Sequence, residues 1–183
     1  MSFDNSLSFK EKEADRPTIL PPAVRRKIFL YLALLTLPLA LSDPNGGVIG
    51  IPISFFLKNK LNLNAHELAY FHLLSAIPLY MSFVFGFIRD SWSPFEIRDR
   101  GYFMIFGAIG GALYAFFAFI PVSYLSLLVA VTLLTTASLF IGSSLNGLAS
   151  TIGQQHAMSG QISAVLNTFG SLPIAASLLI GGV

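Results

Sequence analysis

The sequence predicts an all-α integral membrane protein, a bundle of about five transmembrane helices with the N-terminus inside. Of its 183 residues, 54% are hydrophobic and 11% are charged, and the mean hydropathy is +0.71. A soluble fold cannot bury so much apolar surface. The charges are also segregated, because no Asp, Glu, Lys or Arg follows Arg100. The long stretch after that residue therefore needs lipid around it.

Composition and motifs exclude several classes of function. The chain has no cysteine, so disulfides, thiolate metal sites and cysteine nucleophiles are excluded. The net charge of +2 comes from basic clusters near the ends of spans, which indicates membrane orientation and no nucleic-acid partner. Motifs of membrane hydrolases, ATPases and metalloproteases are missing, and the histidines lack metal-ligand spacing. We therefore expect no enzyme activity, no metal and no cofactor other than a coupling proton.

The polar segment 1–24 is predicted to be a cytoplasmic tail, since no apolar run begins near its start as in a signal peptide. A short surface helix at 8–15 is the alternative. The bundle spans 25–183, and its first apolar segment, 28–57, exceeds the roughly 20 residues that a crossing needs. We expect it to be tilted, bent or interrupted near 42–47, because Pro removes a helix donor and Gly adds backbone freedom. Such backbone is tolerated in a membrane only where it faces protein or a water-filled cavity.

Four further apolar segments follow and predict the remaining spans, at 65–88, 101–120, 124–148 and 161–183. The second begins where Asn64 and Glu67 have the spacing of a helix cap and its partner. A polar connection, 150–160, separates the last two. Glycines at positions that allow close helix approach are predicted to serve packing, and they are Gly107, Gly111, Gly170 and Gly181.

Basic residues near the span ends predict the orientation and place the N-terminus inside. One side carries Arg25, Arg26, Lys27, Arg89, Arg98 and Arg100, and the other carries Lys58 and Lys60. The sequence stops at Val183 within an apolar run. We expect a missing C-terminal half or a partner chain, and a natural terminus at the outer face is the alternative.

Asp43 is the leading functional candidate, because an ionised carboxylate within a span costs on the order of 3 kcal/mol unless it is hydrated or paired. It is predicted to bind a proton or a substrate in a central cavity. The alternative is that the helix ends near Leu41 and that Asp43 lies in an aqueous turn, since Asp-Pro-Asn-Gly-Gly is a strong turn signal.

Three further polar side chains complete the predicted substrate-binding or proton-binding set, namely Asn45, His72 and Asn146. Imidazole can exchange protons near neutral pH, and amides can bond a solute. Each of these groups could equally form hydrogen bonds between helices.

The loop after the second span carries the most specific pattern, consisting of Gly86, Asp90, Arg98 and Arg100. We interpret it as a charge latch, in which Asp90 pairs with arginines and caps a neighbouring helix in one conformation and releases them in another. A plain positive-inside loop is the alternative.

This loop resembles the Gly-x-x-x-Asp signature, followed by basic residues, between the second and third helices of the major facilitator superfamily. The run Gly-Phe-Ile-Arg-Asp-Ser-Trp-Ser-Pro-Phe, with Arg98-Asp99-Arg100 beyond it, most resembles folate-biopterin transporters. The resemblance covers 25–183. It departs where Ser91-Trp92-Ser93-Pro94 replaces the usual Gly and basic residue, and where the fourth helix lacks the arginine of many proton-coupled members.

The resemblance implies an incomplete N-terminal half of a multi-pass facilitator-type transporter in a plasma or inner membrane. Such transporters have two six-helix halves, bind a small organic solute between them and work by alternating access. A different class of function remains open, that of a non-transporting scaffold or assembly subunit whose helices only pack against a partner.

Overall fold

The computed structural model describes residues 20–91 and 99–181, and all regular structure in these ranges is α-helical. This confirms the predicted all-α membrane fold. Residues 1–19 of the predicted tail (1–24) lie outside the described residues, whereas 22–24 already belong to the first described helix. In chain order the helices are α2 (Pro22–Leu41), α3 (Gly47–Asn59), α4 (Ala65–Ser75), α5 (Ile77–Tyr80), α6 (Ser82–Ser91), α7 (Asp99–Ala118), α8 (Tyr124–Gln155) and α9 (Ser159–Gly181).

The first apolar segment is divided into α2 and α3, and the break at 42–46 lies where the sequence predicts an interruption. Pro22 lies in the first turn of α2, where its missing N–H costs no hydrogen bond. At the other end the Ser42 hydroxyl donates to the carbonyl of Pro38 at 2.6 Å and closes the last turn. The chain then leaves the helix at Asp43 and Pro44 before α3 begins at Gly47.

The second apolar segment, 65–88, is not the single helix that the sequence suggests, since it is split into α4, α5 and α6 at Ala76 and Met81. Pro78 accounts for the break at Ala76, because it has no N–H to donate to the Leu74 carbonyl and its ring would clash with that carbonyl. The start of α4 agrees with the prediction. Asn64 and Glu67 form a reciprocal capping box with two hydrogen bonds of 2.9 Å.

The fourth helix is longer than expected, because α8 continues to Gln155 and not to 148. The predicted polar connection at 150–160 is therefore mostly helical, and it contains no proline that would end α8 earlier. The chain turns only around Ala157, whose φ of 51° is left-handed, and α9 begins at Ser159.

Three described helices are each long and apolar enough to cross a membrane, at Arg100–Ala118, Tyr124–Gln155 and Ser159–Leu179. Of the remaining helices, α2 has 20 residues but carries Arg25, Arg26 and Lys27 near its start, and the others are shorter, including the apolar stretch Val48–Asn59 of α3. The prediction of about five spans thus requires two interrupted crossings. One would consist of α2 and α3, and the other of α4, α5 and α6. Interrupted helices occur at membrane depth where they line a binding site.

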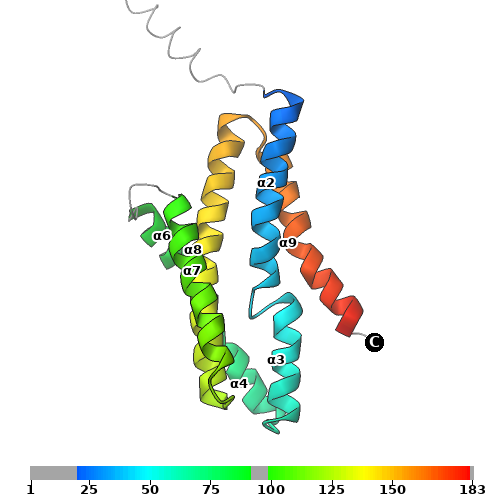
Figure 1. Ribbon diagram of the computed structural model, residues 1–183, viewed down its shortest axis with the longest axis vertical. Coiled ribbons are helices and arrows are strands. Elements are labelled where there is room, and N and C mark those ends of the chain that lie inside the picture. The colour runs from blue at the N-terminus through cyan, green and yellow to red at the C-terminus, as the bar shows by residue number, and fades with distance from the viewer. Residues whose placement is uncertain (1–19, 92–98, 182–183) are drawn as a thin grey trace, which may run out of the picture.

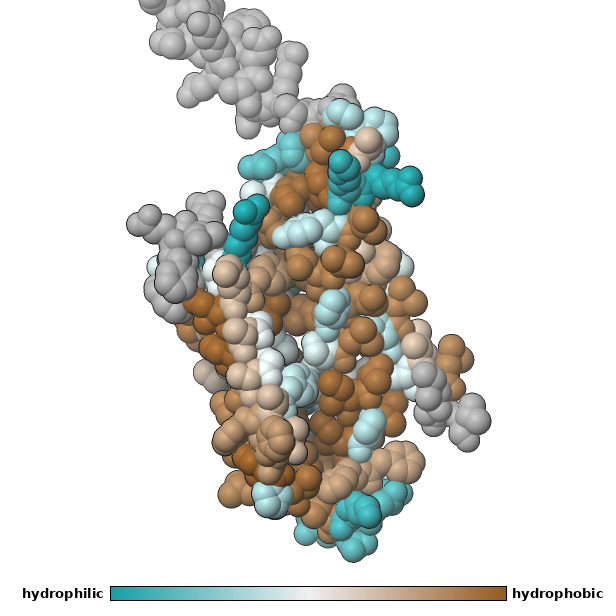
Figure 2. All heavy atoms as spheres, in the orientation of Figure 1, coloured by the Kyte–Doolittle hydropathy of each residue, from teal (hydrophilic) through white to brown (hydrophobic). Residues whose placement is uncertain are grey.

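The helices pack as two main pairs, α2 along α9 and α7 along α8, with α3 also against α9 and α4 against α8 (Figure 1). One core cluster is centred on Leu32, Leu145 and Ile162, and a second on Leu57, Phe71 and Val131. Figure 2 shows hydrophobic residues over a long middle band, with hydrophilic residues at both ends. This distribution is expected of a bundle whose sides face lipid.

Candidate functional site

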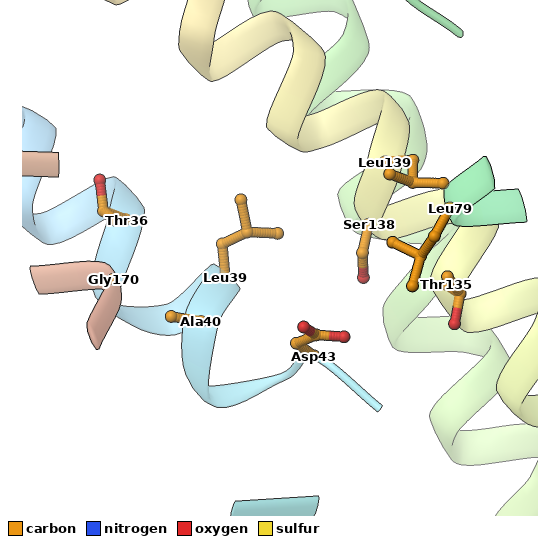
Figure 3. Close-up of a pocket in the computed structure, with 9 residues that line it drawn as sticks. All are labelled: Thr36, Leu39, Ala40, Asp43, Leu79, Thr135, Ser138, Leu139 and Gly170. Atoms are coloured by element: carbon orange, nitrogen blue, oxygen red, sulfur yellow. The ribbon is translucent and has the colours of Figure 1, made fainter. Parts of the chain in front are cut away.

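A cavity of about 260 Å³ lies beside the break between α2 and α3 (Figure 3). Asp43 points into it from the break, and Thr135 and Ser138 line it from α8 on the other side. The remaining lining residues are mostly apolar, and they are Thr36, Leu39, Ala40, Leu79, Leu139 and Gly170. We call this space the Asp43 cavity.

Asp43 also lies about midway between the two basic ends of its segment. By the helical rise of about 1.5 Å per residue, it lies roughly 24 Å along the chain from Lys27 and roughly 22 Å from Lys58. Its carboxylate has no cationic partner among residues 20–91 and 99–181. Asp43 thus follows the end of α2, as one alternative expects, and faces a cavity within the bundle, as the other expects. Its binding of a proton or substrate stays a prediction.

Local backbone geometry holds the Asp43 carboxylate in place. The backbone N–H of Asn45 donates to Oδ1 of Asp43 at 3.1 Å, an Asx turn. A Cβ at position 46 would lie 3.0 Å from Oδ2 of Asp43. Gly46 therefore leaves room for the carboxylate where any other residue would push against it.

The side chain of Asn45 connects the break to two other helices. Its Nδ2 donates to Oγ1 of Thr135 in α8 at 2.5 Å, and its Oδ1 accepts from Oγ of Ser75 in α4 at 3.4 Å. Thr135 is 1% exposed and donates in turn to the Val131 carbonyl at 2.7 Å. The amide predicted to bind substrate thus forms hydrogen bonds within the protein.

Tyr114 of α7 is a functional candidate that the sequence reasoning missed. Its hydroxyl donates to the backbone carbonyl of Ser42 at 2.6 Å, next to Asp43. This bond joins α7 to the end of α2, although α7 otherwise packs along α8. The available signal was a hydroxyl-bearing ring well inside an apolar span, since a tyrosine there normally finds a partner.

His72 lies in a second cavity, which is lined by Asn45, Gly46, Gly50, Ile51, Ser54, Phe55 and His72 and has a volume of about 370 Å³. Nε2 of His72 lies 3.2 Å from Oγ of Ser54, so a side chain of α4 meets one of α3. We call this space the His72 cavity. Asn146 lines neither cavity and is exposed on α8.

The predicted charge latch is only partly within the described residues, because Arg98 lies outside them. Asp90 pairs with its neighbour Arg89 at 3.2 Å and is 71% exposed. Gly86 has open space where a Cβ would be, and Arg100 is exposed at the start of α7. The Arg89 guanidinium lies directly over Gly147 of α8, where it would overlap any Cβ. The arginine in contact with the bundle is thus one that the predicted latch did not include.

The predicted packing glycines differ in their surroundings. Gly170 faces Thr36 of α2, and a Cβ atom built at Gly170 would lie 3.7 Å from Cγ2 of Thr36. A Cβ atom built at Gly107 or Gly111 would have no neighbouring described atom within 4 Å. The structure therefore does not show the close helix approach expected at these two glycines. Gly181 is the last residue of α9.

No group of three or more His, Cys, Asp or Glu that could hold a metal occurs within the described ranges.

Comparison with known proteins identifies the family of this chain. Neither a curated protein nor a solved structure matches the chain. A family model, that of the BT1 family, matches residues 46–175, which is more than half of the chain. The protein therefore belongs to the BT1 family, a family of membrane transporters that includes folate-biopterin transporters.

Proposed function

We propose that this chain forms part of a secondary transporter of the facilitator type, which moves a small organic solute by alternating access. The observation that carries the proposal is the Asp43 carboxylate, which faces a cavity between α2, α8 and α9 without a cationic partner in the described part of the chain. An unpaired carboxylate at such depth costs about 3 kcal/mol or more. A proton, a solute cation or a hydrogen-bond donor of the solute would offset that cost.

The chemistry of the cavity favours a solute with both polar and apolar parts. Asp43, Thr135 and Ser138 supply hydrogen-bonding groups on two facing walls, while the rest of the lining is mostly apolar and includes three leucines. A few polar groups in a mostly apolar cavity are typical of small-molecule sites. In facilitator-type transporters the site lies between two halves, so we propose that a second half or a partner chain supplies the opposite wall.

The test is uptake of labelled folate and biopterin, the solutes named for relatives in the family, by cells that express this chain together with the proposed second half or partner chain. Asp43→Asn is expected to reduce uptake at least tenfold or to remove its dependence on external pH, while the amount in the membrane stays normal. Glu67→Gln is the matched control, because it also neutralises a carboxylate but lies at an exposed helix cap outside the cavity.

The two outcomes separate the classes of function. Wild-type uptake and pH profile in Asp43→Asn would remove Asp43 from the mechanism. Uptake no higher than in cells without the protein, for either solute, would favour the scaffold or assembly subunit, for which the uncovered glycines of α7 offer a contact surface.

A further inference from the structure

The two cavities meet at one hydrogen bond. Thr135 lines the Asp43 cavity and Asn45 lines the His72 cavity, and Nδ2 of Asn45 donates to Oγ1 of Thr135 at 2.5 Å. The bonded pair is therefore part of the wall between the two spaces. We propose that this pair is a gate, and that the His72 cavity is the vestibule through which a solute reaches Asp43. This inference rests on the proposed transport function.

The two sides of the gate differ in how firmly they are held. Thr135 is fixed within α8, since it is 1% exposed and bonds to the Val131 carbonyl at 2.7 Å. Asn45 lies in the non-helical break, directly before Gly46, and its other side-chain bond, to Ser75, is long at 3.4 Å. Loss of the Thr135 bond thus leaves the Asn45 side chain with one long hydrogen bond, while the Asn45 backbone N–H keeps its bond to Asp43. Opening requires the movement of Asn45, while α8 can stay in place.

The vestibule offers its own hydrogen-bonding pair to an arriving solute. Ser54 of α3 and His72 of α4 face each other at 3.2 Å, and the Phe55 side chain adds an apolar surface that is 63% exposed. Hydroxyl and imidazole each donate and accept, so a small solute with a donor and an acceptor can replace the bond between them. The solute that fits here is of the same polar and apolar class as the one that fits the Asp43 cavity.

The absence of cysteine from the chain permits a direct test. Ser54→Cys places a single thiol in the vestibule, and Ser138→Cys places one in the Asp43 cavity. Each is treated with a charged, membrane-impermeant maleimide on sealed cells. Asn59→Cys, exposed at the end of α3, identifies the membrane face. If it does not react from outside, inside-out vesicles present that face.

From the face that labels Asn59→Cys, we expect Ser54→Cys to react readily and Ser138→Cys slowly. Addition of Thr135→Val should accelerate labelling of Ser138→Cys by about tenfold, the shift that loss of one hydrogen bond can produce. Thr136→Val is the matched control, because it also removes a hydroxyl bonded to its own helix, at 2.8 Å to Thr132, but does not bond to Asn45.

Equal labelling rates of Ser138→Cys with and without Thr135→Val would overturn the gate. An unreactive Ser54→Cys would overturn the vestibule. Because labelling does not depend on uptake, a gate that fails this test is distinguishable from a failure of the transport proposal, which the Asp43→Asn measurement decides.

Discussion

Tyr114→Phe should destabilise the protein by removing one hydrogen bond between α7 and the end of α2. The phenol donates to the Ser42 carbonyl at 2.6 Å and is 37% exposed. Phenylalanine keeps the ring and its packing, so only the hydroxyl is lost. The change therefore isolates the hydrogen bond from the apolar contacts of α7.

The size of the effect follows from the setting of this bond. Hydrogen bonds between membrane helices contribute about 0.6 kcal/mol on average and up to about 1.7 kcal/mol, and neutral bonds in soluble proteins about 1 kcal/mol. The short distance and the apolar surroundings favour a value near 1 kcal/mol. For a chain of this length that corresponds to a Tm lower by about 2–4 °C.

Thermal unfolding in detergent, followed by far-UV circular dichroism, measures this shift. Tyr31→Phe is the control, since Tyr31 is half exposed on α2 and no bond from its hydroxyl to a described residue is present. If Tyr114→Phe and Tyr31→Phe unfold at the same temperature, the bond to Ser42 contributes nothing, and the idea that α7 secures the break is wrong.

Three further changes test separate parts of the structure. Asn64→Ala should destabilise the start of α4 by about 1 kcal/mol through loss of the capping box, measured as a lower midpoint of thermal unfolding; an unchanged midpoint would contradict the cap. Gly46→Ala should displace the Asp43 carboxylate, because the new methyl group would lie 3.0 Å from Oδ2, and uptake should fall while membrane insertion stays normal. Asp90→Ala should abolish uptake with normal insertion if the charged loop gates transport, whereas wild-type uptake would reduce the Asp90–Arg89 pair to a surface contact.

Local chemistry made the break at 42–46 and the cap at Asn64 predictable. Pro44 and the glycines after it disfavour helix whatever surrounds them, and a capping box is defined by neighbours three residues apart. A cavity beside Asp43 was predictable for a related reason, since irregular backbone within an apolar segment is tolerated only where it faces protein or a water-filled cavity.

Contacts between distant segments were not predictable in this way. Tyr114 and Ser42 are 72 residues apart, and no pattern in either segment indicates the other. The contact between Arg89 and Gly147 was not predictable either. The missing side chain of Gly147 makes room for the guanidinium only because α6 lies against α8, and the sequence does not indicate that packing. The division of the segment after Asn64 was missed for another reason, namely that its total length suits one crossing while Pro78 divides it.

The length of α8 has a practical consequence for following transport. At 32 residues the helix is about 48 Å long, against a hydrocarbon thickness of about 30 Å. Even with tilt, we expect one end of α8 to extend into the aqueous region, and the exposed residues Gln154 and Gln155 form its polar C-terminal end. A spin label or fluorophore at either position would be joined by one continuous helix to Thr135. Tilting of α8 during a cycle would therefore appear as an amplified displacement of the probe, without any change to the residues that line the cavities.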